Sequence, residues 1–310
     1  MRKLIVGAND ANQRVDKFLS KALPSLPKSL MYKYIRNKKI KVNGKRCEIS
    51  QRLFEKDELT CYIAEEFFER KKDDSFLKAP SQLNIIYEDA HILIMNKPVG
   101  LLCHSDENGQ VDTLVNRMKH YLYKKGEYRF EMEQSFVPAL CHRIDRNTQG
   151  IVIGAKDAQS LRDMNQRIHD CKIEKQYLCL VEGKMEKSKA VMECYHKKEN
   201  QRVYISDFSQ PGYKKIKTGY QVLEETTSLS LLKVDLYSGK SHQIRAVMAH
   251  LHHPLYGDTR YQAKKVSYPY QALCAYRIRF LESEDGLSYL NHKEFSISKN
   301  EIDFLSLLKK

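Results

Sequence analysis

Short apolar segments of β type and segments with helical spacing follow one another irregularly along most of this chain. We expect strands at residues 83–89, 91–98, 151–157, 175–183, 230–239 and 270–280. Residues 157–170 and 242–253 instead indicate helices, the first through the spacing of Leu161, Met164 and Ile168. Because no regular strand–helix–strand repeat connects these elements, an α+β fold is favoured over a doubly wound parallel sheet.

The first 64 residues have a pattern of their own. Val15, Phe18 and Leu19 lie on one face of an expected helix, which ends before two prolines. Ser29 is expected to cap a second helix. The sequence IKVNGKRC at 40–47 then indicates a hairpin with an Asn-Gly turn. We interpret residues 1–64 as one compact domain.

Residues 65–82 are dense in charged side chains and differ in character from both neighbouring segments. We interpret them as a charged linker, or alternatively as a short helix that docks on one domain. The second domain then covers residues 83–310. Within it, Gly100 and Gly150 are expected to serve tight turns.

The charge balance favours a polyanionic partner. The chain has 53 Lys and Arg against 39 Asp and Glu, which gives a formal net charge of +14. An excess of this kind favours nucleic acid before a membrane surface. No apolar run reaches the ~18 residues needed to span a bilayer, so no transmembrane helix is expected. The first residues also lack the apolar stretch of a signal peptide, so we expect a cytoplasmic protein without a membrane partner.

The cysteines also fit a cytoplasmic protein. The chain has 8 of them, and none forms a CxxC pair with the spacing of a zinc site. We therefore expect reduced, small core residues and no metal site.

The segment CHRIDRNTQGIVIGAKD, at 141–157, contains the most distinctive arrangement of charge. Asp145 lies between Arg143 and Arg146, just before a polar turn and an apolar strand. Adjacent cations favour the ionised carboxylate, and guanidinium groups bind phosphates well. A surface ion pair explains this pattern as well as chemistry does. A carboxylate beside phosphate-binding cations makes most sense if it takes part in a reaction.

This segment also resembles the HRLDxxTSG motif of RluA-type pseudouridine synthases. Three further segments match family blocks in the same order: NIIYEDAHILIMNKPVGLLCH, EKQYLCLVEG and LYSGKSHQIRAVMAHLHHPLYGDTRY. Together they cover residues 83 to about 280. The resemblance implies a mixed, largely antiparallel sheet with the active site in a central cleft. It also implies an isomerase that needs neither a cofactor nor a metal.

The resemblance implies a role for several residues. Asp145 matches the catalytic aspartate, Arg245 the arginine that pairs with it, and Tyr177 the tyrosine beside the target base. Arg143 matches the arginine that fills the space left by a flipped nucleotide. Arg146 and Lys240 are expected to contact phosphate. Whether Asp145 attacks the ribose, attacks the uracil or removes a ribose proton stays open at this point.

The N-terminal residues 14–45 resemble an S-four type RNA-binding domain. Their exposed cations are expected to bind backbone phosphate, and we expect the main contacts from Lys33, Arg36, Lys38 and Lys39. A solvated helix face with a charged hairpin is the alternative interpretation.

These observations predict an RNA pseudouridine synthase that modifies selected uridines in structured RNA. Large-subunit ribosomal RNA is the favoured substrate and transfer RNA the alternative. A non-catalytic RNA-binding or ribosome-assembly protein would fit the charge equally well, but not the set of Asp145, Tyr177 and Arg245. A hydrolase of glycosidase type would ordinarily need a second catalytic carboxylate. We infer no obligate protein partner.

Overall fold

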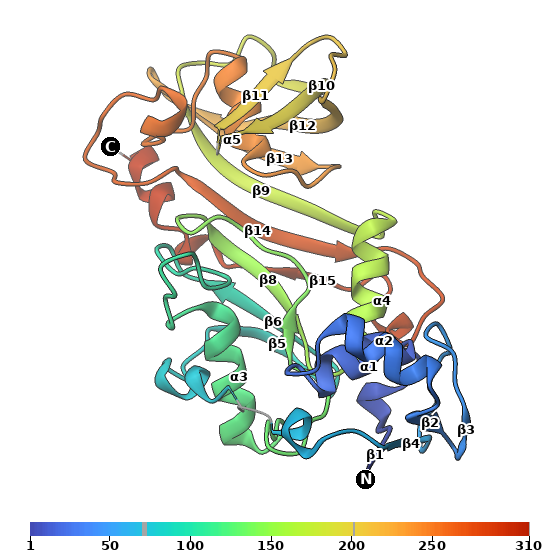
Figure 1. Cartoon of the computed structure of the whole chain (residues 1–310). Helices are drawn as coiled ribbons and strands as arrows, with labels where there is room; N and C mark the ends of the chain where they lie inside the picture. Colours follow the sequence, from blue (N-terminus) through green and yellow to red (C-terminus); the bar gives the residue numbers. More distant parts are fainter. Residues whose placement is uncertain (70–72, 201, 310) are drawn as a thin grey trace.

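The chain forms two β-sheets in a computed structural model (Figure 1). The structure describes residues 1–69, 73–200 and 202–309. The smaller sheet has four strands in the order β1-β4-β2-β3. Their bounds are β1 Arg2–Ile5, β2 Ile40–Val42, β3 Lys45–Arg46 and β4 Glu58–Cys61. Helices α1 (Val15–Ala22) and α2 (Lys28–Arg36) pack against them around a separate apolar core.

Local sequence explains this first module. Val15, Phe18 and Leu19 are buried on one face of α1, as their spacing predicted. Asn43 and Gly44 both have positive φ, at 50° and 72°, which fits the tight turn between β2 and β3. The expected cap at Ser29 was wrong, because α2 begins directly after Pro27 and Ser29 lies inside its first turn.

The larger sheet has 11 strands and confirms the expected mixed, largely antiparallel α+β architecture. Its central order is β11-β10-β12-β13-β9-β14-β8-β6-β5, with β15 beside β14 and β7 beside β8. The strand bounds are β5 Ile85–Glu88, β6 Ile92–Lys97, β7 Ala139–Leu140, β8 Gln149–Ala155, β9 Ile173–Glu182, β10 Lys189–Glu199, β11 Arg202–Ser206, β12 Lys214–Glu225, β13 Leu229–Leu236, β14 Leu273–Phe280 and β15 Glu294–Ser296.

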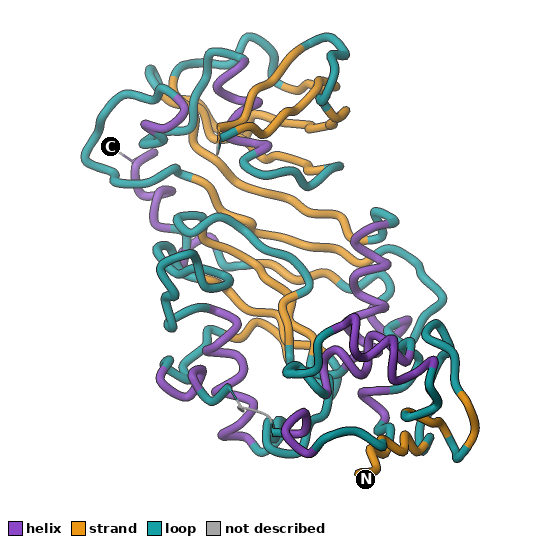
Figure 2. Tube along the Cα trace, in the orientation of Figure 1, coloured by secondary structure: helices purple, strands orange, loops and turns teal. Residues whose placement is uncertain are grey.

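Helices cover both faces of this sheet (Figure 2). Their bounds are α3 Leu114–Lys125, α4 Ala158–His169 and α5 Gln243–His250. Shorter 3-10 helices are η1 Ala8–Asp10, η2 Glu65–Phe68, η3 Ser75–Lys78, η4 Thr259–Tyr261, η5 Ser288–Leu290, η6 Lys299–Glu301 and η7 Asp303–Lys309. One core includes α3 and α5, and the other includes α4 and the C-terminal segment. Alternate residues of the fully buried β6 enter the two cores.

The segment between the two sheets does more than connect them. Phe76 of η3 is 2% exposed, packs into the core that contains α3, and contacts the rings of Tyr123, Tyr128 and Phe130. The alternative of a short docking helix therefore describes Ser75–Lys78 better than a free linker does. Residues 70–72 of the expected linker lie outside the described residues.

The N-terminal module also contacts the larger part of the chain. Gln13 Nε2 donates to Ser135 Oγ over 2.7 Å, and the Ser135 hydroxyl donates to the buried carboxylate of Asp10. The Asn9 side chain accepts a hydrogen bond from the backbone N–H of Ala158, at the start of α4, over 3.1 Å. In Figure 1 the module accordingly lies beside α4.

Candidate active site

A cleft of about 1130 Å³ crosses the middle of the larger sheet. One wall is the loop at 142–148, which leads into β8, and the opposite wall is the loop at 237–242, which leads into α5. The first half of β9, with Lys175 and Tyr177, supplies part of the lining between them. The fold thus joins three segments that are separate in the sequence.

A guanidinium group connects two carboxylates in this cleft. Arg245 Nη1 donates to Asp145 Oδ2 over 2.9 Å. Its Nε and Nη2 donate to the two oxygens of Asp258 over 2.7 and 2.8 Å. Arg245 therefore forms its planar two-point pair with Asp258 and a single bond with Asp145. The arginine and Asp258 are buried, whereas the side chain of Asp145 is 29% exposed to the cleft.

The electrostatics of this cluster favour a charged arginine. Burial by itself lowers the pKa of Arg245, but the hydrogen bonds and charge of Asp258, with the added charge of Asp145, raise it overall. One positive charge is thus shared between two carboxylates. Asp145 gains a charge-assisted hydrogen bond without being enclosed, which suits a group that must meet a substrate.

Tyr177 extends from β9 into the same cleft. It is 9% exposed and belongs to the apolar core under the cleft. Burial, and then the charge of Asp145, raise the pKa of its hydroxyl, so the phenol stays protonated at neutral pH. The sequence prediction that Tyr177 and Asp145 lie in one cleft agrees with this geometry.

His242, to which the sequence gave no role beyond structural hydrogen bonding, is a neighbour of Asp145. Its Nε2 lies 3.7 Å from Asp145 Oδ2, and its Nδ1 lies 2.9 Å from the hydroxyl of Tyr261. Burial, reinforced by the charge of Arg245, lowers the pKa of His242 despite the opposing effect of Asp145. Its backbone is left-handed, with φ of 52°, which turns the chain into α5.

A buried lysine holds the loop that carries Asp145. Lys97 is fully buried, and its Nζ donates to the backbone carbonyls of Pro98, Leu101 and Arg146 over 2.8, 2.8 and 2.9 Å. Burial lowers the pKa of Lys97 to about 8. Three carbonyl oxygens thus fix the ammonium group between the loop after β6 and the loop before β8.

Gly150 corrects one expectation from the sequence. It lies in β8, where β8 pairs in parallel with β14, and a Cβ atom at this position would come within 2.5 Å of Ala275 N. Its φ of 141° and this close approach explain the glycine, so the tight-turn interpretation was wrong. Gly100, with φ of 84° in the turn after β6, fits that interpretation.

The opposite loop is held by Gln243. This side chain is 2% exposed, and its Oε1 accepts hydrogen bonds from Ser238 Oγ and Lys240 N over 3.0 and 3.1 Å. Its Nε2 donates to Lys217 O and Thr218 Oγ1 of β12 over 3.1 and 2.9 Å. The glutamine therefore fixes the cleft-facing loop to the sheet.

The remaining predicted residues divide into three groups. Arg143 and Lys240 are exposed and line the cleft. Arg146 is not among the lining residues; its Nε donates to Gly100 O over 3.1 Å on the other side of the loop. The cations of the N-terminal module are all exposed on α2 and the turn after it: Lys33, Arg36, Lys38 and Lys39.

Asp258 and Tyr261 belong to the segment that ends in GDTRY, but the resemblance implied no role for either. The local sequence around Asp258 gives no sign that Arg245 is its partner, since this pairing arises only when η4 packs beside α5. Of the expected small core cysteines, Cys171 is exposed, so that interpretation was wrong for this residue. No helix in the described ranges has the length and apolar character to cross a bilayer.

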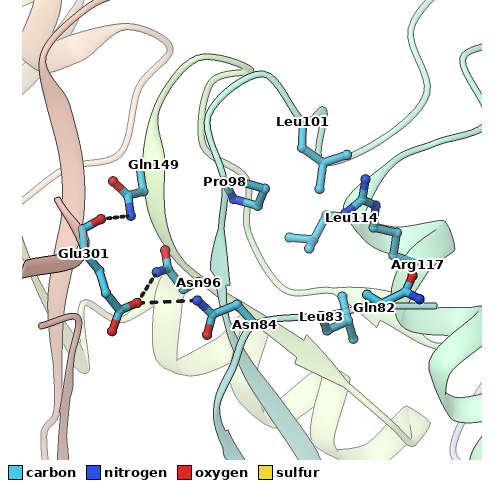
Figure 3. A pocket seen from close by; sticks show the side chains of 10 residues that line it. All are labelled: Gln82, Leu83, Asn84, Asn96, Pro98, Leu101, Leu114, Arg117, Gln149 and Glu301. Carbon is cyan, nitrogen blue, oxygen red and sulfur yellow. Dashed lines mark hydrogen bonds between the residues drawn. The ribbon is translucent and has the colours of Figure 1, made fainter. Parts of the chain in front are cut away.

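A second pocket, of about 460 Å³, shares no lining residue with the cleft (Figure 3). Glu301 Oε2 accepts from Asn96 Nδ2 over 3.1 Å and from Asn84 Nδ2 over 3.4 Å. Gln149 Nε2 donates to the backbone carbonyl of Glu301 over 2.8 Å. The first two bonds attach the C-terminal segment to β6 and to the residue before β5, and the third attaches it to the start of β8, immediately after the loop that carries Asp145.

Known structures define the class of this fold. The human protein RNA Pseudouridylate Synthase Domain Containing 4 superposes with a TM-score of 0.59 over 73% of this chain and 93% of its own, at 17% identity. The chain therefore has the pseudouridine synthase fold.

Sequence comparison identifies the family. Residues 91–250 match the RNA pseudouridylate synthase family, and residues 13–59 match the S4 domain. An uncharacterized RNA pseudouridine synthase of Mycoplasma capricolum is 34% identical over 94% of this chain and 96% of its own. A ribosomal large subunit pseudouridine synthase C of Buchnera aphidicola is 31% identical over 81% and 77%. This chain belongs to the RNA pseudouridine synthase family, whose members are isomerases that act on RNA.

Proposed function

We propose that Asp145 is the catalytic carboxylate of this RNA pseudouridine synthase. The observation that carries this role is the hydrogen bond from Arg245 to Asp145, because Arg245 is itself fixed by Asp258. A carboxylate held on one oxygen by a rigid cation keeps its other oxygen for the reacting atoms. Its partial exposure to the cleft gives a nucleotide direct access.

The reaction breaks the bond from uracil N1 to ribose C1′, rotates the base and forms a bond from C5 to C1′. The base must leave its stack, which costs roughly a few kcal/mol. In this proposal the ring of Tyr177 supports the flipped uracil, and Arg143, exposed at the cleft, stacks where the base had been. No electron is gained or lost: C5 gives up its proton when it bonds to C1′, and N1, which has lost C1′, takes up a proton.

Large-subunit ribosomal RNA is the substrate we propose. The support is the Buchnera relative, a ribosomal large subunit pseudouridine synthase C that aligns with 81% of this chain. The S4 match adds a module whose exposed cations suit backbone phosphate. Transfer RNA remains the alternative substrate. A cytoplasmic location follows from either RNA.

Pseudouridine mapping of total RNA, with and without the gene, tests the substrate. The proposal expects the loss of one or more sites in large-subunit ribosomal RNA. The loss of transfer RNA sites alone would identify the alternative substrate.

Asp145→Asn tests the catalytic role on a transcript that carries a mapped site. We expect turnover to vanish while RNA affinity stays within about tenfold, since backbone contacts dominate affinity. Asp112→Asn is the matched control, because Asp112 pairs with Arg117 outside the cleft lining. Normal turnover by Asp145→Asn would end the assignment.

A further inference from the structure

The strands β10, β11 and β12 form a sheet region with two different faces. Alternate residues of β10, such as Met192 and Cys194, belong to the apolar core with Ile216 of β12. The residues between them lie on the other face. There Val191 is 51% exposed and Tyr204 of β11 is 44% exposed. This second face is therefore open to solvent.

Tyrosines and lysines are interleaved on this outer face. Strand register places Tyr195 beside Lys215, and Lys197 beside Tyr204. Lys217 Nζ lies 5.3 Å from the ring centre of Tyr237. We call this surface the tyrosine–lysine face, and its members are Tyr195, Lys197, Tyr204, Lys215, Lys217 and Tyr237.

Positive charge exceeds negative charge on this side of the sheet. The outward cations of the described strands are Lys189, Lys197, Arg202, Lys215, Lys217 and Lys233. The outward carboxylates are fewer: Glu193, Glu199, Glu224 and Asp235. Glu193 Oε2 lies 2.6 Å from Lys215 Nζ, and Glu193 Oε1 lies 3.6 Å from Lys217 Nζ. One carboxylate therefore forms ion pairs with two lysines. An excess of cations fits a polyanion.

Tyr237 connects the tyrosine–lysine face to the catalytic cleft. It is 49% exposed and is one of the residues that line the cleft beside Gly239 and Lys240. Its ring also lies against Gly219 of β12, where a Cβ atom would approach the ring to 3.3 Å. An RNA strand that leaves the cleft across the loop at 237–242 would thus pass over the ring of Tyr237 and reach the tyrosine–lysine face.

We propose that the tyrosine–lysine face binds the single-stranded RNA that flanks the target uridine, an inference that rests on the proposed function. Exposed rings stack on bases of any sequence, and the lysines between them neutralise phosphates. A second copy of the chain is a poorer occupant, because two faces with the same excess of positive charge repel each other.

Photo-crosslinking locates the bound strand directly. The full chain is irradiated with a 12-nucleotide oligo(rC), which contains no uridine, and then digested with trypsin. We expect adducts on peptide 203–214, which contains Tyr204, and on peptide 234–240, which contains Tyr237. Adducts confined to the cleft loop at 141–148 and to the N-terminal module would overturn the proposal.

Substitution of one ring tests whether stacking matters. Tyr204→Ala should weaken oligo(rC) binding about fivefold or more, whereas Tyr204→Phe, which keeps the ring, should bind as the wild type does. Equal binding by both variants would contradict the stacking role. A wild-type protein that makes no pseudouridine would refute the proposed function instead. That measurement uses the wild-type protein alone, so the two failures are distinguishable.

The oligomeric state distinguishes RNA from the other possible occupant of this face, a second copy of the chain. If Tyr204→Ala binds oligo(rC) normally and a wild-type dimer dissociates in Tyr204→Ala, the face is a contact between copies and the proposal fails. A monomer in both forms, together with weaker oligo(rC) binding by Tyr204→Ala, supports it.

Discussion

Arg245 and Asp258 form a buried two-point ion pair, with Nε and Nη2 of the arginine 2.7 and 2.8 Å from the two carboxylate oxygens. The third hydrogen bond of the guanidinium goes to Asp145. Asp258 thus determines the direction from which Arg245 approaches the proposed catalytic carboxylate. The position of Asp145 depends on a residue that never needs to touch RNA.

Arg245→Lys should be a severe substitution. Lysine keeps the charge but cannot hold Asp258 at two points and reach Asp145 as well. Since one hydrogen-bonded partner of a buried pair is lost, the free energy of unfolding should fall by about 2–4 kcal/mol. Turnover should fall far more than RNA affinity. Urea unfolding and single-turnover kinetics measure both effects.

Arg117→Lys is the matched control. Arg117 forms the same two-point pair with Asp112, but with the Asp112 side chain 40% exposed. Exposed pairs contribute up to about 1 kcal/mol, so this variant should stay close to the wild type in stability and turnover. Wild-type turnover in Arg245→Lys would show that Arg245 does not position Asp145.

The elements with strong local patterns were predictable from the sequence, and the others were not. The helix α4 and the strands β6, β8 and β9 carry continuous or helically spaced apolar residues. Strands β10 to β12 were missed because they contain no continuous apolar run: charged and polar residues such as Lys189, Glu193 and Tyr195 interrupt the apolar ones on β10. The apolar residues of the helix α3 are less concentrated on one face than those of α4, so α3 gave a weaker signal.

For the site, motif resemblance supplied Asp145, Tyr177 and Arg245, and the fold brings all three to one cleft. It could not supply the pairing of Arg245 with Asp258. Nor could it indicate that Arg146 faces Gly100, since neighbouring arginines in a turn point in different directions. Such orientations depend on contacts between residues that are distant in the sequence, and the local sequence does not indicate these contacts.

Stability should depend on pH through His142. Burial, and then the charge of Lys175, lower the pKa of His142 from its ordinary 6.5 to about 3, while Nε2 accepts from the Ile153 N–H. At a pH between these two pKa values, His142 binds a proton in the unfolded chain but not in the folded chain. The free energy of unfolding should therefore fall as pH drops below about 6.5, by at most about 1.4 kcal/mol per pH unit.

His142→Gln removes this titration and should flatten the decline between pH 6.5 and pH 5. Urea unfolding at both pH values measures it. His252→Gln replaces an exposed histidine and should leave the slope unchanged. If His142→Gln and His252→Gln decline as steeply as the wild type, His142 is not the group responsible.

Metal removal should leave activity intact. Arg245 already places a positive charge against both Asp145 and Asp258, so these carboxylates do not need a divalent ion for neutralisation. After dialysis against EDTA, turnover on prefolded RNA in monovalent salt should match that of the untreated enzyme. RNA melting under the same conditions controls for loss of RNA structure. Activity that returns only with added zinc would contradict this expectation.

The division of the chain into parts can be tested by two truncations. Phe76 packs in the core with Tyr128, so residues 73–310 keep this contact and residues 83–310 lose it. We expect the longer fragment to fold with Asp145 and Arg245 in place. The shorter one should lose about 3–5 kcal/mol of stability, as Phe76→Ala in the full chain should. Thermal or urea unfolding of all three proteins checks this.

The longer fragment also measures what the N-terminal module contributes to RNA binding. It lacks Lys33, Arg36, Lys38 and Lys39, so the slope of log affinity against log salt should flatten by about 3–4. Chemistry at saturating RNA should survive, because none of these cations lines the cleft, while efficiency at low RNA falls. An equal salt slope in both proteins would show that the module does not bind RNA. A folded fragment without activity at saturation would show that the contacts of Asp10 and Gln13 with Ser135 help to build the active site.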